Sequence, residues 1–546
     1  MKKESKDDFF NGEPYKRIKL SQELLEKGIL DISVNREPRQ IIVSYEHEGK
    51  QMKPVSVAIL EFPYPTVDQL DNLVNGSMTL ETLTHVKGFL ILNLYPHWNK
   101  LYMNSKSSKG KRIPLIEDAT EEIISKYNFI TLEETDQIWY YREGVYVSGG
   151  EILIAKELEN SFGYELNTAN LSQIIAHIKR QTYHKKEELD ADINIINLKN
   201  GLYDIDNNKL LEHNSKYLSV KQSPIVYDAS AKPKRFLKFL QEVLYPRDIL
   251  TAIDAIAYTF HRDYDIVEIL FILLGYGRNG KTVFTSVVSS MHGQDHVSNV
   301  TLSQMLDDRF ALSDLENKNV NIDNELAGQS IKETGIIKRL TAGSRQPVRI
   351  QRKNEKAYDV ILYAKLVFCA NKIPVSQDNS VAYHRRPIIL SFPNTFEKED
   401  DDPDLTKKVT TEQELSGLFN IAMRALRRIR KTKELYVNEK SVQERQEKYE
   451  RAVNPVSAFV KEAISEESTE KDVESKAYVY GIYNLFCNKY SLPFERYQTF
   501  CKSMLNELDL KDARPLLDGE RVQCWKGILL KPEYAQKTEQ TRLDTD

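Results

Sequence analysis

The alternation of apolar and polar positions gives the first quarter of the chain a mixed character. Residues 1–103 combine short strand-like runs with helical ones, and the runs Arg39–Tyr45 and Val55–Phe62 predict strands. The small, polar and basic stretch Asn104–Arg112 predicts a linker. We therefore expect an N-terminal domain over 1–103, to which the pattern assigns no role.

Residues 113–235 carry both helical and β patterns and predict an α+β domain. Aromatic and β-branched residues flank Gly-containing turns in Ile138–Ile154, which predicts a hairpin. A second hairpin is predicted over Ile195–Leu211, with its turn at Asp206, Asn207 and Asn208.

Residues 236–433 alternate helical patterns with short apolar strands, which is typical of an α/β sheet, the fold class that we expect for the chain. The longest apolar run, Ile269–Leu274, predicts a buried strand and is far too short for a membrane span. At the end of this region, Glu414–Lys431 predicts one amphipathic helix.

The last part of the chain begins with the polar stretch 434–452, which predicts a linker, and ends with a polar tail, 534–546, that we expect to be disordered. Between them, residues 453–533 predict three helices followed by a strand, a turn and a strand. The predicted segments are Val456–Ile464, Lys476–Tyr490, Arg496–Leu508 and Arg514–Leu530, with the turn at Asp518 and Gly519. This order suggests a winged-helix-like domain, which binds DNA or serves as a packing and docking domain.

Composition narrows the class of protein. Of 546 residues, 41% are hydrophobic and 29% charged, as in ordinary soluble globular proteins, and the length suggests three or four domains. The net charge of −4 excludes a surface coated in basic residues, but it leaves room for a local basic patch that binds nucleic acid.

The four cysteines are too few and too far apart for a disulfide framework, and none forms a C-x-x-C pair, which argues against a cysteine zinc site. The charged N-terminal residues lack the apolar core of a signal peptide. We therefore expect a soluble, intracellular protein without membrane partners.

The strongest chemical motif follows the predicted strand at Leu274 and precedes a predicted helix. It matches the phosphate-binding pattern G-x-x-x-x-G-K-[ST] with Gly275, Tyr276, Gly277, Arg278, Asn279, Gly280, Lys281 and Thr282. The backbone N–H groups of such a loop face phosphates, Lys281 reaches the β- and γ-phosphates, and the Thr282 hydroxyl binds Mg²⁺. The motif predicts ATP and Mg²⁺ as ligands.

An ATPase also needs acidic groups at the end of a neighbouring strand, and Asn319–Leu326 supplies Asp323 and Glu325. Asp323 is predicted to hold Mg²⁺ and Glu325 to activate the attacking water. The two acids are separated by one residue, and Asn321 interrupts the apolar run, so the division of roles stays open, as does a solvated acidic turn.

Downstream, residues 346–362 predict a β-hairpin that carries Arg349, Arg352, Lys353 and Lys356 on its strands and tip. A basic hairpin directed into a channel would bind the phosphates of a single strand. An ordinary solvated hairpin is the alternative.

Two further polar sites lie at strand ends. The apolar run Leu366–Ala370 ends in Asn371, whose amide could bind a γ-phosphate or the attacking water, or could merely end the strand. Arg385 and Arg386 precede another predicted strand and could stabilise charge on a transferring phosphoryl group, or could form a surface ion pair.

Taken in order, GYGRNGKT, NIDNEL, the basic hairpin, AKLVFCANKIP and AYHRRPIILSF resemble the superfamily 3 helicases of the AAA+ class, in particular the poxvirus-type primase–helicase group. The segment from Ile193 to Asp228 is similar to the domain that precedes the helicase in that group. The resemblance covers roughly 113–431 and makes 236–433 the AAA+ domain.

The resemblance implies a replicative DNA helicase or translocase that forms a hexameric ring, with ATP between subunits and single-stranded or forked DNA in the pore. It makes Lys281 and Thr282 the Walker A pair, Asp323 and Glu325 the Walker B acids, and Asn371 sensor 1. It makes Arg386, or alternatively Arg385, an arginine finger acting on the neighbouring subunit, and it places Lys353 and Lys356 at the DNA-gripping tip. A virus or mobile element in a host cytoplasm is the implied setting.

Many relatives carry a primase domain, but the pairs Asp190/Asp192 and Asp204/Asp206 lie in polar turns without a convincing S-x-H partner. A separate primase or polymerase is therefore an expected partner. An ATP-switched initiator that assembles on DNA without processive unwinding is the alternative function.

Overall fold

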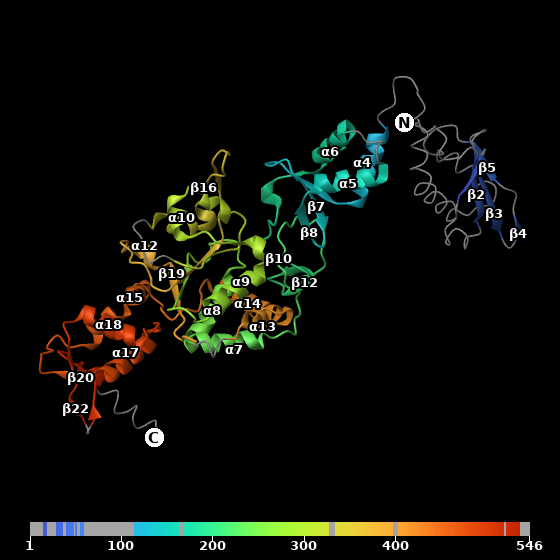
Figure 1. The fold of residues 1–546 in the computed structure, drawn as a ribbon. Coiled ribbons are helices and arrows are strands. Elements are labelled where there is room, and N and C mark those ends of the chain that lie inside the picture. The colour runs from blue at the N-terminus through green and yellow to red at the C-terminus, as the bar shows by residue number, and fades with distance from the viewer. Residues whose placement is uncertain are drawn as a thin grey trace, which may run out of the picture. The chain divides into compact units, whose positions relative to one another are not determined.

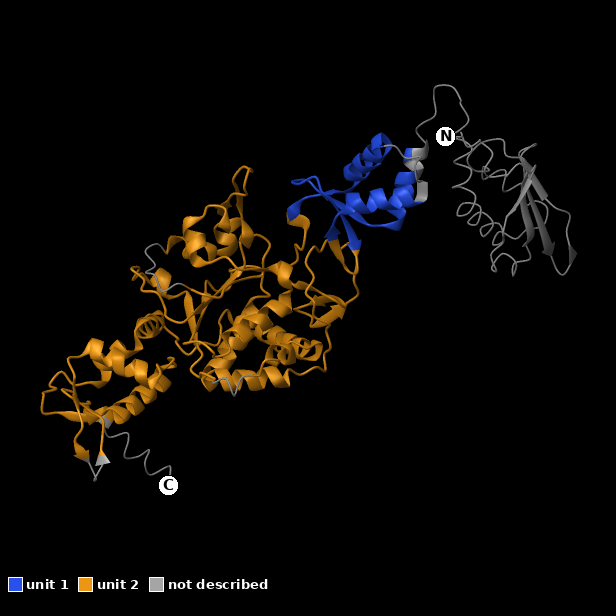
Figure 2. Ribbon diagram, viewed as in Figure 1, with its two compact units in different colours: residues 1–141, 147–186 blue, residues 142–146, 187–546 orange. Residues whose placement is uncertain are grey.

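The computed structural model describes residues 15–18, 29–35, 40–47, 50–51, 55–58, 114–162, 168–326, 334–396, 402–517 and 520–535 (Figure 1). The chain divides into two compact units, one formed by 1–141 with 147–186 and the other by 142–146 with 187–546 (Figure 2). The boundaries between the two units, at 141/142, 146/147 and 186/187, lie inside 113–235, which the sequence pattern groups as one domain.

Strands in the first unit near the N-terminus confirm the two strands expected there. They are β1 (Tyr15–Ile18), β2 (Ile29–Asn35), β3 (Gln40–His47), β4 (Lys50–Gln51) and β5 (Val55–Ala58), and β3 pairs antiparallel with β2, β4 and β5. The predicted linker 104–112 and residues 536–546 of the predicted tail lie outside the described residues.

Helices also pack against a four-stranded sheet in the order β8-β7-β6-β9, which belongs to the first unit except for the last residue of β7 and the first two of β8. The elements are α4 (Pro114–Lys126), β6 (Phe129–Leu132), β7 (Ile138–Arg142), β8 (Val145–Ser148), α5 (Gly150–Phe162), α6 (Thr168–Thr182) and β9 (Tyr183–His184). The predicted hairpin ends at Ser148 instead of Ile154. Ile154 and Leu158 are buried four residues apart, which is the helical period, whereas Ile152 is exposed.

The second unit is built on a parallel sheet of five strands in the order β14-β15-β18-β13-β19. The strands are β13 (Leu270–Leu274), β14 (Val297–Ser298), β15 (Val320–Asp323), β18 (Lys365–Ala370) and β19 (Pro387–Ser391). Every residue of these strands is buried, as expected for a parallel sheet covered on both faces. The predicted buried strand at 269–274 is confirmed.

Strand β13 supplies both hydrophobic cores of this unit. Phe271 and Leu273 belong to a core with α7, α8, α9 and α14, whereas Leu270, Ile272 and Leu274 belong to the core on the opposite face. The helices of the first core are α7 (Lys234–Val243), α8 (Ile249–Tyr258), α9 (Lys281–His292) and α14 (Glu412–Thr432). The helix predicted at Glu414–Lys431 is thus confirmed. Because alternate side chains of β13 enter the two cores, the loop that follows β13 is held between two packed layers.

Shorter elements complete this part of the unit. Strands β10 (Ile195–Leu198), β11 (Gly201–Asp204) and β12 (Lys209–Leu211) form an antiparallel sheet, so the second predicted hairpin is confirmed and gains a strand. The hairpin predicted at 346–362 is also confirmed, as β16 (Val348–Ile350) paired with β17 (Tyr358–Val360). The remaining helices are α10 (Leu302–Asp307), α11 (Gly335–Leu340), α12 (Val381–His384) and α13 (Leu405–Val409).

Residues 434–452, predicted as a linker, contain most of α15 (Val442–Val453). Ser441 and Glu444 form a capping box at its start, and Tyr449 and Ala452 are buried, so the helix has both a start signal and a packed face.

The three helices predicted beyond it are confirmed as α16 (Pro455–Ala463), α17 (Lys476–Tyr490) and α18 (Tyr497–Glu507). Antiparallel strands follow or flank them: β20 (Val473–Ser475), β21 (Lys511–Ala513), β22 (Leu516–Leu517), β23 (Glu520–Arg521) and β24 (Cys524–Lys526), with α19 (Pro532–Ala535) at the end. The predicted turn at 518–519 lies outside the described residues. No helix in the described part of the chain is long and apolar enough to cross a membrane.

Candidate functional site

The glycine-rich loop connects β13 to α9, and its geometry requires glycine at two positions. Gly280 has a φ of +89°, and a Cβ there would lie 2.8 Å from Val243 and 3.0 Å from Phe239 of α7. A Cβ on Gly275 would lie 1.9 Å from the Asn279 amide. The loop therefore packs too tightly for side chains at either position.

Lys281 opens α9, and its ammonium group points back into the loop. Its Nζ donates to the Gly275 carbonyl at 2.5 Å and to Oδ1 of Asn279 and of Asn371, each at 3.3 Å. Burial lowers the pKa of Lys281 below its ordinary value, since the charged form loses hydration. A phosphate entering the loop would offer this ammonium stronger acceptors than neutral carbonyls.

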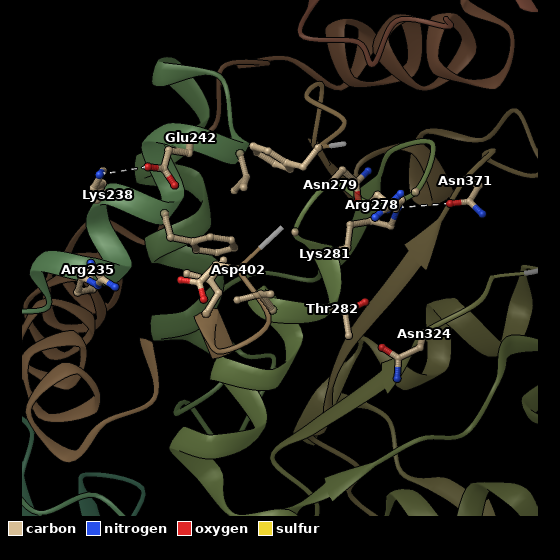
Figure 3. Close-up of a pocket in the computed structure, with 17 residues that line it drawn as sticks. Arg235, Lys238, Glu242, Arg278, Asn279, Lys281, Thr282, Asn324, Asn371 and Asp402 are labelled. Carbon is tan, nitrogen blue, oxygen red and sulfur yellow. Dashed lines mark hydrogen bonds and ion pairs between the residues drawn. The ribbon is translucent and has the colours of Figure 1, made fainter. Parts of the chain in front are cut away.

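The sheet order brings Asn371 to the loop. Asn371 directly follows β18, which lies beside β13, and its amide meets Lys281 across the carboxyl ends of the two strands (Figure 3). The structure thus brings together two residues that are 90 positions apart.

A cavity of about 620 Å³ opens in front of the loop. The predicted residues Gly277 to Thr282 line it together with Asn371 (Figure 3). Further lining residues that the sequence analysis missed come from three other regions: Arg235, Lys238, Phe239, Glu242, Val243, Asn324, Phe396, Asp402 and Leu405. Phe239 and Val243 repeat at helical spacing on α7, where they are indistinguishable from ordinary core positions.

The two predicted acids occupy different environments. Asp323 is 3% exposed, and its carboxylate accepts the backbone N–H of Leu302 and of Glu325, both at 3.1 Å. Glu325 is exposed, and neither acid lines the cavity, whereas the intervening Asn324 does. The assignment of Mg²⁺ to Asp323 and of the water to Glu325 stays a prediction.

Asn321, which interrupts the apolar pattern of β15, has a structural role. It is fully buried, accepts the Val300 N–H at 2.9 Å and donates to the Val300 carbonyl at 2.9 Å. The Asn321 side-chain amide thereby satisfies both backbone hydrogen-bonding groups of Val300, as a paired peptide group on a neighbouring strand would.

In the part of the chain that the structure describes, the basic residues of the hairpin fall into two groups, those with an internal ion pair and those without one. Arg349 pairs with Asp359 at 3.3 Å, and Arg352 pairs with the buried Glu316 at 2.7 Å. Lys353 and Lys356 are exposed at the tip, and the structure shows no ion pair for either within the described residues. The tip lysines therefore offer charge to an external anion without breaking an internal pair.

Arg385 and Arg386 precede β19, at the edge of the sheet opposite the phosphate loop. Arg386 is 4% exposed and donates to Thr341 at 2.7 Å, to Glu268 at 2.6 Å and to the Ala382 carbonyl. Arg385 is exposed and also pairs with Glu268. The structure does not bring either arginine to the phosphate loop of its own chain.

Two protein families match parts of the chain. Residues 94–245 match the family described as "D5 N terminal like", and residues 273–386 match a "Family of unknown function (DUF5906)". The second match runs from β13 to Arg386 and therefore includes the phosphate loop, Asp323, the hairpin and Asn371. No curated protein matches the chain.

Among solved structures, the chain is similar to "The apo structure of NrS-1 C terminal region (305-718)", at 13% identity and a TM-score of 0.39 over 77% of this chain and 100% of that chain. It is also similar to "The A form apo structure of NrS-1 C terminal region-CTR", at 12% identity and a TM-score of 0.36 over 76% and 98%. Similarity at this level establishes no shared activity.

The lysine of the loop can be tested directly. If the loop binds and hydrolyses ATP as its motif predicts, replacing Lys281 with Ala removes the ammonium that faces Asn371 and should reduce hydrolysis below about a tenth of wild type, because the cost of losing a charge-assisted contact to phosphate exceeds about 1.4 kcal/mol. Phosphate release in Mg-ATP and binding of a fluorescent ATP analogue measure the loss. Lys216→Ala, which removes an exposed lysine away from the cavity, serves as the control. Hydrolysis above that level in Lys281→Ala would refute the phosphate-loop assignment.

Proposed function

We propose that the protein is an ATP-dependent DNA helicase or translocase of a virus or mobile-element replication system, related to the primase–helicases. In this proposal residues 236–433 form a superfamily 3 AAA+ core, and a homohexameric ring acts on single-stranded or forked DNA. The observation that carries the proposal is the contact between Lys281 and Asn371 at the mouth of the cavity. The match to the D5 N terminal like family adds support.

The strand order supports the proposal of hydrolysis over that of simple nucleotide binding. Strand β18 lies between β13, which leads to the phosphate loop, and β15, which leads to the acids. Asn371 therefore stands between the loop and Asp323 at one edge of the sheet. An amide in this place can orient a water toward a terminal phosphate, and the Glu325 carboxylate, on the segment that follows β15, can accept the proton of that water.

Each residue then has a defined task. Lys281 neutralises charge on the β- and γ-phosphates, and the exposed Thr282 hydroxyl, with Asp323, would hold Mg²⁺. Such an ion takes few protein ligands and relies on phosphates and water for the rest. Glu325 would act as the base for water, provided that its exposed side chain turns toward the cavity.

The contacts of the two arginines favour Arg385 as the finger. A finger must leave its own chain to reach the ATP of a neighbour. All three nitrogens of the Arg386 guanidinium group are bonded within the chain, whereas Arg385 is exposed. We therefore assign the role of arginine finger to Arg385 and a packing role to Arg386.

The function is tested by measuring ATP hydrolysis with and without single-stranded DNA, together with strand displacement on a forked duplex. A translocase should hydrolyse ATP faster in the presence of single-stranded DNA and should separate the fork. An ATP-switched initiator would bind DNA in ATP without separating the fork. Failure of both stimulation and displacement in an assembled protein would contradict the helicase proposal.

The tip lysines provide a second test. The double variant Lys353→Ala/Lys356→Ala should weaken binding of single-stranded DNA and flatten its log–log dependence on salt by roughly 0.7 for each lost phosphate contact. ATP hydrolysis without DNA should persist, since neither lysine lines the cavity. The double variant Lys209→Ala/Lys216→Ala removes the same charge from another exposed surface. An unchanged salt slope would place the DNA path elsewhere.

Subunit mixing tests the finger. Arg385→Ala alone should lose on the order of 10³-fold in hydrolysis while still binding ATP through its intact loop. Mixing it with Lys281→Ala should restore activity, because some interfaces then pair an intact loop with an intact finger. Arg386→Ala is made in parallel, and rescue by that variant instead would return the role to Arg386. No rescue with either, under conditions where subunits exchange, would exclude both.

A further inference from the structure

A single carboxylate, Glu268, binds three arginines just before β13. Its Oε1 accepts Nη1 of Arg345 at 2.9 Å, and its Oε2 accepts Nη2 of Arg386 at 2.6 Å and also Nη2 of Arg385. We call these four residues the Glu268 cluster. The Glu268 side chain is only 14% exposed, so these ion pairs are partly shielded from water.

Charge in the cluster does not balance. Three guanidinium groups share one carboxylate, whereas the nearby carboxylates of Asp265 and Asp263 accept the His261 ring at 2.6 Å and the Ser344 N–H at 2.9 Å instead of an arginine. Because one negative charge serves three positive ones, a stronger pairing of any arginine with Glu268 weakens the hold on the others.

The three arginines differ in their freedom to leave. Arg386 is fixed by Thr341 and the Ala382 carbonyl in addition to Glu268. Within the described residues, Glu268 is the only hydrogen-bond or ion-pair partner of the Arg385 side chain, which is 45% exposed. Arg385 is therefore the member that an external phosphate can draw away.

Arg345 connects the cluster to the basic hairpin. It lies three residues before β16 and also donates to the Asp265 carbonyl at 2.5 Å. The segment before it is seated tightly, because a Cβ on Gly343 would lie 2.2 Å from Asp263. A displacement of the hairpin is thus passed to Arg345 over a short, well-packed stretch of chain.

We propose that Glu268 is a positioning residue that holds Arg385 back, and that Arg345 competes for the same carboxylate and so links DNA on the hairpin to release of Arg385. When DNA shifts the hairpin, Arg345 draws Glu268 with it through Oε1, the contact of Oε2 with Arg385 is weakened, and Arg385 becomes available to the ATP of the neighbouring subunit. This inference rests on the proposed function, since it requires hydrolysis and DNA binding by an assembly of this chain.

Two variants of the cluster should change hydrolysis in opposite directions. Glu268→Gln keeps hydrogen-bond acceptance but loses the charge, so it should raise hydrolysis without DNA. Arg345→Ala removes the competitor, strengthens the hold on Arg385 and should lower hydrolysis without DNA. Each change should lie between about 1.5- and 5-fold, the range of exposed ion pairs. A purely structural cluster would lose activity in both variants.

The stimulation by single-stranded DNA gives the second readout. Glu268→Gln and Arg345→Ala should both bring the ratio of stimulated to unstimulated hydrolysis close to one. Arg345→Lys should keep part of the stimulation. The control Arg424→Ala, which removes an exposed arginine on α14, should show the wild-type ratio. Binding of labelled single-stranded DNA and thermal unfolding are measured alongside. If Glu268→Gln does not fold, the stimulation ratios of Arg345→Ala and Arg345→Lys are sufficient to test the coupling.

Failure of the coupling and failure of the function give different results. Wild-type protein without DNA-stimulated hydrolysis would remove the proposed function and this inference together. Wild-type protein that is stimulated, with Arg345→Ala and Glu268→Gln retaining the wild-type ratio or both losing unstimulated activity, would overturn the coupling and leave the helicase proposal standing.

Discussion

The burial of β13 on both faces is the constraint on which the rest of the site depends. Its alternate residues enter two separate hydrophobic cores, so neither its register nor its direction can change without disrupting both. The phosphate loop begins where this strand ends, and Lys281 consequently stands at a fixed distance from the neighbouring strand. A loop on a less constrained strand could not hold an ammonium against Asn371.

The two edges of the same sheet carry different chemistry. The carboxyl edge gathers the phosphate loop, Asn371 and Asp323, whereas the amino edge carries Glu268 and its arginines. A parallel sheet makes this separation unavoidable, because all its strands start at one edge and end at the other. A residue at the amino edge lies away from the glycine-rich loop of its own chain, and this is why we propose that Arg385 acts on the loop of a neighbouring chain.

Local patterns predicted the elements well where period and turn chemistry agreed. The strand at Leu270–Leu274, helix α14 and the β16–β17 hairpin all appear within a few residues of their predicted bounds. Prediction failed where composition was used in place of packing. Residues 434–452 are polar enough for a linker, yet Tyr449 buries its ring beside Tyr383 at 5.8 Å between centroids and holds the segment as a helix.

The sequence by itself determined the place and local geometry of the glycine-rich loop, because its glycines and Lys281 lie within eight consecutive residues and act through local backbone conformation. It also determined the basic character of the hairpin tip. Only the tertiary structure decided that Asn324 lines the cavity in place of Asp323 and Glu325, that α7 closes the cavity, and that Arg386 is buried while Arg385 is exposed. These facts depend on strand order and on contacts between distant segments, which adjacent letters in a sequence do not encode.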